Sequence, residues 1–529
     1  MSVMAYMPFG AGGIIIRVES DIRRGIPGID ISGLAEGAVR EARDRVRAAF
    51  RNSGFSFPLD RILINLAPAG LKKYGAALDL PIALSVMAAA NIAPVSGNLL
   101  VMGELELSGN IRPVRGVLAA IAEGLSEGIT EFIVPAENAG EAAILSEKGA
   151  KFTAAKNLQD AVHALFIREE TGELPLSLVS SPTAKVAANT AADMSEIGGD
   201  FADVRGQAVY KRAMEIAAAG GHNVLVFGPP GAGKTMLARR LPSIMAPLTP
   251  DEAVEVTRLY SLAGPHHDGG FIDRLITSPP FRAPHHSASA EGILGGGRIP
   301  RPGEISLAHF GVLFLDEAPE FRVNVLQALR EPLEDRVISI VRAEGPVRLP
   351  AEFQLLMTAN SCPCGRLGIR ESSNACFCSP EEINRYWRKF GGALLDRVEI
   401  RAAILPPKIE EMGRRNPSCA EEKSSVIAAR VRAAVEIQRR RFKGTGIRRN
   451  ALLPAGKADD FCPMSEKAES AFHLAVSKLG LSGRAYHGIL RVARTIADLD
   501  GKDTIETEHI LEAVQHRRLG EDPWEILSF

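Results

Sequence analysis

The sequence of 529 residues lacks any apolar run long enough to span a bilayer, which takes about 20 consecutive apolar residues. Its amino terminus also lacks a basic segment followed by an apolar core and a cleavage site, so we expect no secretory signal. Hydrophobic residues make up 46% and charged residues 24% of the chain, which is ordinary for a globular protein. We therefore expect a cytoplasmic protein with no membrane-embedded part and roughly two to four domains.

An excess of charge of either sign is also lacking, because the formal net charge is −1 at pH 7. Bulk electrostatics therefore does not draw the protein to nucleic acid. Binding of a polyanion would depend on local basic patches, or on a ring of subunits that concentrates them. Two segments are candidates, residues 439–449 (RRRFKGTGIRR) and residues 388–397 (RKFGGALLDR). A solvated helix end followed by a glycine turn is the structural alternative.

Cysteine is scarce outside one segment, because four of the six cysteines fall within 17 residues. These are Cys362, Cys364, Cys376 and Cys378. A reducing cytoplasm makes them a poor disulfide framework and a better metal candidate. Two C-x-C pairs could supply four thiolates to one tetrahedral Zn²⁺, while free thiols and a redox switch remain as alternatives. Cys419 and Cys462 stand alone and are expected to be ordinary thiols.

The pattern of apolar runs and turn residues divides the chain into three structured parts and a linker. Residues 1–167 mix short β-like runs with Ala-rich helical stretches, which predicts an α+β domain. Residues 168–200 are rich in Ser, Thr, Pro and small residues, which predicts a linker. In residues 201–405 strands alternate with helices, which predicts a parallel α/β core. Residues 406–529 have helical periodicity and predict a carboxyl-terminal helical lid.

A phosphate-binding loop is the most specific motif in the chain. The segment GPPGAGKT fits G-x-x-x-x-G-K-[ST] and lies between a predicted strand (NVLVF) and a predicted helix (MLARRLP). Backbone N–H groups freed by Gly231 and Gly233 would face the β-phosphate at the helix N-terminus. Lys234 would reach the β- and γ-phosphates, and the Thr235 hydroxyl would ligate Mg²⁺. The loop consists of Gly228, Pro229, Pro230, Gly231, Ala232, Gly233, Lys234 and Thr235.

An acidic strand supplies the second half of the predicted nucleotide site. The apolar run VLFL ends in Asp316 and Glu317, about eighty residues after the P-loop. We expect Asp316 to hold Mg²⁺ together with Thr235. Glu317 is the candidate that polarises the attacking water.

Three more polar residues are candidates for completing a γ-phosphate site. Asn360 follows the apolar strand FQLLMTA, where a polar side chain could orient the water. Arg397 in LLDR is a candidate arginine finger that acts on the nucleotide of a neighbouring subunit. Arg484 in LSGRAYHGIL is a candidate reader of the γ-phosphate from the helical lid, and Arg491 is the alternative for that role. A surface position is the structural alternative for a single helical arginine.

Taken together, these segments resemble the magnesium-chelatase-like AAA+ family of bacteria, the YifB/ComM competence-protein group. The resemblance runs over nearly all of the chain, and its most specific carriers are PFRAPHHS and IPRPGEISLAHFGVLFLDE, with CPCG, CFC and LLDRVEI. It implies a hexameric ring that hydrolyses ATP with Mg²⁺. It also implies insertions, similar to those of the MCM helicases, that line a central pore through which DNA would pass.

The amino-terminal part resembles the proteolytic domain of Lon proteases, whose fold is related to ribosomal protein S5 domain 2. The segments that carry this resemblance are KKYGAALDLPIALSVM and VMGELELSGNIRPVRGVLAAIAEG. In Lon a Ser nucleophile and a Lys base form the catalytic pair, and these positions fall on Ala77 and near Leu118 here. Neither side chain supplies a hydroxyl or an amine. We therefore expect a non-proteolytic domain and disfavour an ATP-dependent protease.

Two functions then remain, and both are implied by the resemblance. The first is a hexameric DNA helicase that promotes branch migration of recombination intermediates during natural transformation. It predicts ATP hydrolysis that is stimulated by single-stranded or branched DNA. The second is a chelatase-type AAA+ remodeller of a protein partner, which predicts indifference to DNA. The Lon-like domain and the cysteine segment favour the first.

Overall fold

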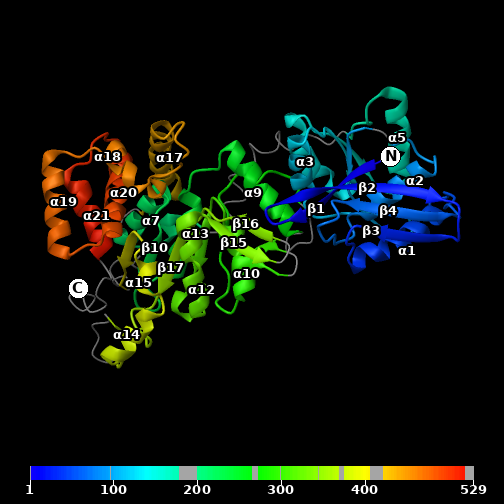
Figure 1. Ribbon diagram of the computed structural model, residues 1–529. Coiled ribbons are helices and arrows are strands. Elements are labelled where there is room, and N and C mark those ends of the chain that lie inside the picture. Colours follow the sequence, from blue (N-terminus) through cyan, green and yellow to red (C-terminus); the bar gives the residue numbers. More distant parts are fainter. Residues whose placement is uncertain are drawn as a thin grey trace.

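The computed structural model describes residues 2–95, 97–177, 199–264, 272–297, 300–342, 345–367, 375–405 and 421–518. The chain is elongated, with an amino-terminal α+β part at one end, an α/β part in the middle and helices at the other end (Figure 1). The expected linker falls mostly on residues 178–198, which lie outside the described residues, as does Cys419. Within the described ranges, no helix has both the length and the apolar character needed to cross a membrane.

The amino-terminal part is built on a seven-stranded mixed sheet in the order β3-β4-β2-β1-β5-β8-β9. Its strands are β1 (Ser2–Phe9), β2 (Gly12–Arg23), β3 (Gly28–Ser32), β4 (Arg61–Ala67), β5 (Leu99–Val101), β8 (Glu131–Pro135) and β9 (Lys151–Ala155). Its main helices are α1 (Gly37–Asn52), α2 (Asp79–Ala89), α3 (Val117–Ser126) and α5 (Leu158–Thr171). The core of this part includes Leu174, so its packing continues past residue 167.

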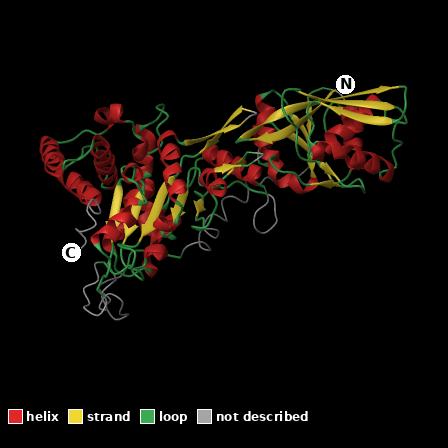
Figure 2. Cartoon of the chain, turned by 60° about the horizontal axis from the view of Figure 1, so that its bottom comes forward, coloured by secondary structure: helices red, strands yellow, loops and turns green. Residues whose placement is uncertain are grey.

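The middle part contains a five-stranded parallel sheet in the order β11-β14-β17-β10-β18. The strands are β10 (Val224–Phe227), β11 (Phe281–Arg282), β14 (Val312–Leu315), β17 (Gln354–Ala359) and β18 (Ile400–Ala403). Every residue of β10, β14 and β17 is buried, as expected for parallel strands that helices cover (Figure 2). The predicted parallel α/β core is therefore confirmed. The helices that bear on the site are α7 (Ala208–Gly220), α8 (Lys234–Ala238), α13 (Arg330–Asp335), α14 (Pro380–Arg388) and α15 (Gly392–Leu395).

Helix α9 (Pro250–Ala263) joins the amino-terminal and middle parts. It follows the P-loop in the sequence, but its Leu262 is buried in the same hydrophobic cluster as α3. The Ser261 hydroxyl donates a hydrogen bond to the buried carboxylate of Glu141 in the amino-terminal part. The core of the amino-terminal part therefore includes side chains that come from the P-loop half of the sequence.

In the described residues of the middle part, two small hairpins lie outside the parallel sheet: β12 (Gly295–Gly296) with β13 (Arg301–Pro302), and β15 (Val337–Arg342) with β16 (Gly345–Pro350). The second hairpin touches the turn between β1 and β2. A Cβ atom added at Gly10 in that turn would lie only 2.6 Å from Cγ1 of Val347 in β16. The amino-terminal part therefore packs directly on a hairpin of the middle part.

The carboxyl-terminal part is helical, as the sequence predicts. Its helices are α17 (Ser424–Arg441), α19 (Glu466–Leu479), α20 (Gly483–Leu499) and α21 (Thr507–Arg518). Helix α20 is continuous through Gly488 and forms part of the same hydrophobic core as β10 and α7. The helical part is therefore packed against the middle part through a shared core.

Candidate active site and metal centre

The predicted nucleotide-binding residues meet at the carboxyl edge of the parallel sheet. β10 leads into the P-loop, β14 is followed by Asp316, and β17 is followed by Asn360. Because β17 lies between β10 and β14, the ends of these three strands are neighbours in space. This edge is where ligands bind in open parallel α/β sheets.

The backbone of the P-loop depends on glycine at particular positions. Gly231 and Gly233 have φ angles of +78° and +86°, which glycine adopts without strain. A Cβ atom at Gly228 would lie 2.2 Å from the carbonyl oxygen of Ile404. Only glycine therefore lets the loop leave β10 this close to the end of β18.

The Lys234 side chain is held at the centre of the loop and is 9% exposed. Its ammonium donates hydrogen bonds to the carbonyl oxygens of Gly228 (2.7 Å) and Pro229 (2.9 Å) and to Oδ1 of Asn360 (3.0 Å). Burial lowers the pKa of Lys234 to about 8, while the carboxylates of the acidic strand act in the opposite direction. The Lys234 ammonium is bound by uncharged oxygens, and the nearby carboxylates neutralise its positive charge only in part. Such an ammonium group is suited to bind phosphate.

The Thr235 hydroxyl lies 3.0 Å from both carboxylate oxygens of Asp316. These are hard oxygen donors, so the pair fits the ligand preference of Mg²⁺. Thr358 in β17 donates to Oδ1 of Asp316 at 2.5 Å and accepts the backbone N–H of Glu317 at 3.0 Å. Thr358 was not singled out from the sequence, although its place two residues before Asn360 predicts the same face of the strand.

Glu317 adopts a left-handed backbone conformation, with φ 49° and ψ 49°. This region is uncommon for residues other than glycine, and such residues cluster at turns and functional sites. The conformation turns the chain from β14 into a short 3-10 helix, Ala318–Glu320, and leaves the Glu317 side chain exposed. An exposed carboxylate at the edge that carries the P-loop can polarise a water molecule.

Two aromatic residues of α14 hold the chain just after the end of β17. The Tyr386 hydroxyl accepts the backbone N–H of Asn360 at 3.2 Å, and the Trp387 indole donates to the Ser361 carbonyl at 3.1 Å. The amide side chain of Asn360 then meets the Lys234 ammonium. Neither aromatic was singled out from the sequence, because its place on a helix does not reveal a contact with a distant strand.

Arg397 and Arg484 are brought together by one carboxylate, that of Glu334 in α13. Arg397 forms an ion pair with Glu334 and donates to the Ala393 carbonyl at 2.6 Å. Arg484, near the start of α20, reaches the same carboxylate at 3.1 Å. Within the described part of the chain, neither arginine forms a hydrogen bond or ion pair with the P-loop or the acidic strand. The hydrogen bond from Arg397 lowers the pKa of Glu334.

Arg491, the alternative to Arg484, lies in a different environment. It donates to the Ala451 carbonyl at 3.0 Å and lies 3.8 Å from a carboxylate oxygen of Glu399. Its side chain is 22% exposed, against 53% for Arg484. Of the two arginines, Arg484 is therefore the one that is accessible and lies beside Arg397.

The four cysteines of the predicted cluster converge. The Sγ atoms of Cys362, Cys364 and Cys376 lie 3.4 to 3.5 Å apart, and all four Sγ atoms fall within 4.8 Å of one another. Zinc–sulfur bonds of about 2.3 Å place tetrahedral thiolates about 3.8 Å apart. The observed separations are compatible with a zinc ion. Cys462 is buried in a different core.

Residues 362–367, the part of the cysteine loop that follows β17, lie directly beside the P-loop. Cys362 comes two residues after Asn360, and a Cβ atom at Gly365 would lie 2.9 Å from Cδ of Pro230. The backbone N–H of Leu367 donates to Sγ of Cys362 at 3.4 Å, which closes the loop. An ion bound by the cysteines would therefore fix the segment that follows Asn360.

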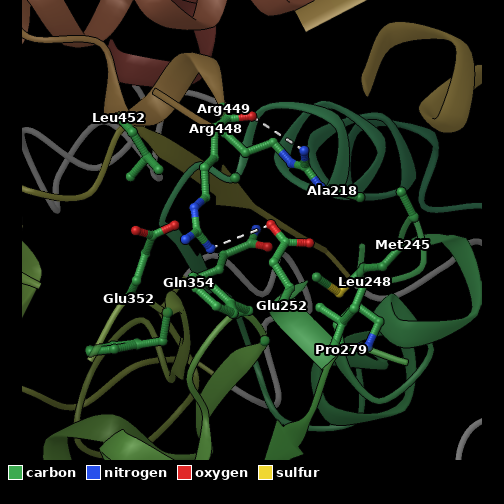
Figure 3. Close-up of a pocket in the computed structure, with 15 residues that line it drawn as sticks. Ala218, Met245, Leu248, Glu252, Pro279, Glu352, Gln354, Arg448, Arg449 and Leu452 are labelled. Atoms are coloured by element: carbon green, nitrogen blue, oxygen red, sulfur yellow. Dashed lines mark hydrogen bonds and ion pairs between the residues drawn. The ribbon is translucent and has the colours of Figure 1, made fainter. Parts of the chain in front are cut away.

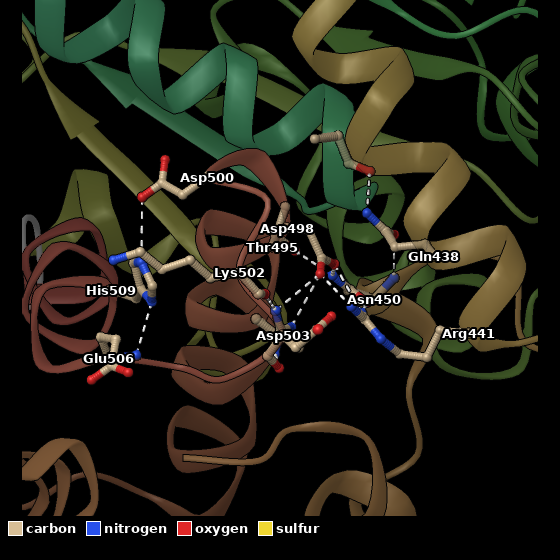
Figure 4. A network of polar contacts seen from close by, with 12 residues as sticks. Gln438, Arg441, Asn450, Thr495, Asp498, Asp500, Lys502, Asp503, Glu506 and His509 are labelled. Carbon is tan, nitrogen blue, oxygen red and sulfur yellow. Dashed lines mark hydrogen bonds and ion pairs between the residues drawn. The ribbon is translucent and has the colours of Figure 1, made fainter. Parts of the chain in front are cut away.

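The basic segment 439–449 is largely engaged within the chain. Arg441 donates to buried Asp498 at 2.9 Å, and Asn450 and Arg494 bind the same carboxylate (Figure 4). In the pocket of Figure 3, Arg448 lies 4.0 Å above the ring of Phe310. These contacts favour the structural alternative over a polyanion-binding surface for this segment.

Arg449 follows Arg448 and lines the same pocket. It donates to the carbonyl of Arg448 at 3.3 Å. In the second basic segment, Lys389 donates to the Pro319 carbonyl at 2.9 Å, and Arg397 pairs with Glu334. In both segments, several basic side chains therefore form hydrogen bonds or ion pairs within the chain.

The positions of the Lon catalytic pair hold no catalytic groups. Ala77 lies just before α2. Leu118 is fully buried in α3, where its backbone N–H donates to the Glu141 carboxylate at 2.8 Å. An inward-facing leucine at this position is a packing residue and cannot act as a base.

A parallel sheet with a P-loop after one strand and an Asp-Glu pair after another defines the class of P-loop nucleotide-binding proteins. Three protein-family models agree with this class, and all three describe one member of it, the ChlI subunit of magnesium chelatase. The model "Magnesium chelatase, subunit ChlI" matches residues 200–412, and "Subunit ChlI of Mg-chelatase" matches residues 18–138. A third, "Magnesium chelatase, subunit ChlI C-terminal", matches residues 421–517.

Relatives match over nearly the full chain. "Uncharacterized protein YifB" of Salmonella typhimurium is 41% identical over 511 residues, which cover 95% of this chain and 94% of the relative. "Competence protein ComM" of Haemophilus influenzae is 39% identical over 510 residues, which cover 96% and 95%. The chain therefore belongs to the YifB/ComM family of magnesium-chelatase-like AAA+ proteins, which indicates an ATPase that uses ATP and Mg²⁺.

A further match concerns a quarter of the chain. "Lon protease 2" of Bacillus subtilis is 33% identical over 147 residues, which cover 26% of each chain. This match agrees with the resemblance to Lon noted from the sequence, and it concerns a small part of that protease.

Proposed function

We propose that this protein is an ATP-hydrolysing AAA+ motor that assembles as a hexameric ring and moves DNA, promoting branch migration of recombination intermediates. The observation that carries the proposal is that Lys234 of the P-loop, the Asp316–Glu317 pair and Asn360 meet at one edge of the sheet. Elsewhere, Arg397 and Arg484 both contact the carboxylate of Glu334. The near full-length relationship to a protein named for competence supports DNA as the partner. The motor acts in the cytoplasm, where ATP and reduced thiols are available.

Within one subunit, each residue of the site has a distinct task. The P-loop N–H groups and Lys234 bind the phosphates, and Mg²⁺ held by Thr235 and Asp316 offsets their charge. Thr358 orients the Asp316 carboxylate. Glu317 polarises the attacking water, and Asn360, fixed by its contact with Lys234, orients that water.

Two arginines complete the site of the neighbouring subunit in this proposal. Arg397 supplies the positive charge that stabilises the transferring phosphoryl group, as an arginine finger. Arg484 lies beside it on Glu334 and contributes from the helical part. Because a subunit without a neighbour lacks these charges at its γ-phosphate, hydrolysis depends on the ring.

DNA passes through the centre of the ring in this proposal, along the hairpins β12–β13 and β15–β16. Val341, near the end of β15, is 81% exposed, and Arg348 of β16 is also exposed. The net charge of −1 makes a single subunit a weak polyanion binder. Phosphate contacts summed around a ring would make DNA binding strongly dependent on salt.

We propose the domain layout on the same basis. Residues 1–167 form a Lon-like, S5-like domain without protease activity, and residues 168–200 form a linker. Residues 201–405 form the AAA+ domain with its insertions, and residues 406–529 form the helical lid. The contacts of α9 and of the β1–β2 turn support a structural or regulatory role of the amino-terminal domain.

A chelatase-type remodeller is the second candidate, because all three family models describe the ChlI subunit of magnesium chelatase. Such a protein would use the same ATP site to change the shape of a partner protein. It would have no need of DNA.

Steady-state ATP hydrolysis by the full chain separates the two candidates. We expect single-stranded or four-way-junction DNA to raise the rate severalfold, with the Glu317→Gln variant as the blank. The reason is that DNA in the pore would bind several subunits and bring each arginine finger to its neighbour. Hydrolysis that is unchanged by every DNA added would refute the motor and favour the remodeller.

We also propose that Cys362, Cys364, Cys376 and Cys378 hold a structural Zn²⁺. Four thiolates suit a closed tetrahedral site, which zinc uses to staple loops without redox chemistry. The N–H groups of Arg366 and Phe377 oppose the effect of burial and lower the pKa of Cys364 to about 6. A thiolate at neutral pH is the form that binds the metal.

Replacing Cys376 with Ser is expected to reduce zinc content from about one ion per chain to a small fraction, because one of four ligands is lost. Metal analysis of the purified protein checks this, with Cys462→Ser as the control, since Cys462 is buried outside the cluster. ATP hydrolysis should fall in the first variant only, because the cysteine loop adjoins Asn360 and Pro230. Equal zinc in both variants would refute the metal site.

A further inference from the structure

A cavity of about 420 Å³ lies where the amino-terminal part meets the β12–β13 hairpin and α9. One wall comes from the amino-terminal part, including the segment around Ala77, and another from residues of the middle part. The cavity is distinct from the P-loop site, because no P-loop residue lines it. Its volume falls in the range of about 300–1,000 Å³ that is usual for small-ligand sites. The lining residues used below are Tyr6, Pro8, Arg115, Leu262, Arg301 and Pro302.

Two arginines face this cavity without an acidic partner. Within the described residues, the side chain of neither Arg115 nor Arg301 forms a hydrogen bond or an ion pair. Burial and then the charge of Arg301 lower the pKa of Arg115, and both side chains line the same cavity. Glu104, the one carboxylate among the described residues that line the cavity, lies 4.0 Å from Arg112, which is not a lining residue.

Arg115 is held in place by its backbone and by packing. The backbone of Val114 exchanges two hydrogen bonds with the Asn138 amide, each of 3.0 Å, and Gly116 donates to the Ser261 carbonyl at 3.1 Å. A Cβ atom at Gly264 would lie 2.7 Å from Nε of Arg115, so the Arg115 side chain lies against the residue that ends α9. The Arg115 guanidinium therefore lies beside the end of α9, with no counter-ion among the described residues.

Arg301 is held from the other side of the cavity. It begins β13 and pairs with Gly296 of β12. A Cβ atom at Gly295 would lie 2.5 Å from the Arg301 carbonyl oxygen, so the two strands can approach only because glycine is there. The hairpin thus presents Arg301 from the middle part toward Arg115 of the amino-terminal part.

We propose that this cavity binds a phosphate group carried on a nucleotide unit. The fork of a guanidinium matches phosphate oxygens in a bidentate geometry, and a phosphate in this cavity would pair with the charge of both arginines. The apolar walls formed by Pro8, Leu262 and Pro302 accommodate the sugar and base. The unit is either a free nucleotide or part of a single DNA strand, and only the second source rests on the proposed function.

Because the two arginines come from different parts of the chain, a bound phosphate would hold the amino-terminal part against the middle part. The site would then link occupancy of the cavity to the position of the β12–β13 hairpin. A ligand that bridges two domains stabilises the arrangement to which it binds.

The test uses the full chain carrying Lys234→Ala, so that the P-loop no longer dominates nucleotide binding. Two probes are titrated separately, adenosine monophosphate and a fluorescein-labelled ten-nucleotide oligothymidylate. We expect Arg115→Gln and Arg301→Gln each to weaken binding of at least one probe by about tenfold. The matched control is Arg43→Gln with Arg61→Gln, which removes two exposed arginines that do not line the cavity.

The outcomes separate the sources of phosphate. Loss of binding of both probes identifies a site that a free nucleotide can fill, whereas loss for the oligothymidylate alone identifies a DNA strand. In the second case the salt slope of oligothymidylate binding should also fall by about 0.7 for each phosphate contact removed. Both probes binding as tightly to the arginine variants as to the control would overturn the site.

The result is independent of the DNA-stimulation experiment. If DNA fails to stimulate ATP hydrolysis but adenosine monophosphate binding depends on Arg115 and Arg301, the motor is refuted and this site stands. For hydrolysis, Arg115→Gln and Arg301→Gln are made in the chain with Lys234 intact. If DNA stimulates hydrolysis equally in that chain and in these two variants, and neither probe loses affinity in the binding test, the site is refuted and the motor stands.

Discussion

Replacing Glu317 with Gln is expected to leave ATP binding intact and to slow hydrolysis by about 10²–10⁴-fold, the range for loss of a general base. The amide has the size of the carboxylate but cannot take a proton from water. Lys234, Thr235 and Asp316 are unchanged, so MgATP should bind as in the parent and hold the ring in its assembled form. Equilibrium nucleotide binding and steady-state phosphate release measure the two effects separately.

The matched control for this variant is Glu320→Gln, in the same short turn. Glu320 is also exposed, but it lies at the far end of the 3-10 helix that follows Glu317. It should hydrolyse ATP at the parent rate. Equal loss in the two variants would assign the effect to the turn, and normal turnover in Glu317→Gln would remove that residue from the chemistry.

Replacing Arg397 with Ala is expected to lower hydrolysis by about 10³–10⁵-fold, the range for loss of an arginine finger. Each subunit should still bind ATP, because Arg397 contacts Glu334 and Ala393 and forms no hydrogen bond with its own P-loop. Glu334→Gln is the control, since it releases Arg397 without removing it. That variant should retain hydrolysis.

A mixing experiment decides whether Arg397 acts on its own subunit or on the next one. Subunits with Arg397→Ala keep an intact P-loop, and subunits with Lys234→Ala keep an intact finger. If Arg397 acts between subunits, mixing the two inactive proteins should restore part of the ATP hydrolysis. A mixture that stays inactive while both proteins enter the same ring would contradict the assignment between subunits.

The parts of the fold that could be predicted from the sequence are those that are encoded locally. The parallel core follows from buried strands alternating with helices, and the helical carboxyl-terminal part follows from its periodicity. The P-loop could be identified because its eight residues are contiguous, and glycine is required there by the backbone itself. The family was recognised from segments of the same kind and is confirmed by relatives over nearly the full chain.

The supporting contacts of the site could not be predicted in this way. Thr358 and Tyr386 hold Asp316 and Asn360, yet a threonine in a strand and a tyrosine in a helix have many possible partners. Glu334 gathers Arg397 and Arg484 from positions 63 and 150 residues away. Contacts between residues so far apart in the sequence depend on how the helices pack, so they cannot be predicted from a local sequence pattern.

By itself, the sequence determined the family, the P-loop, the acidic pair and the presence of four cysteines in two C-x-C pairs. Only the tertiary structure decided that the cysteines converge, that Arg484 and not Arg491 is accessible beside Arg397, and that much of the basic segment 439–449 turns inward. It also decided that α9 joins the amino-terminal core. The physical reason is that a motif is fixed by backbone conformation and residue type, whereas the direction and partner of a side chain are fixed by packing between distant segments.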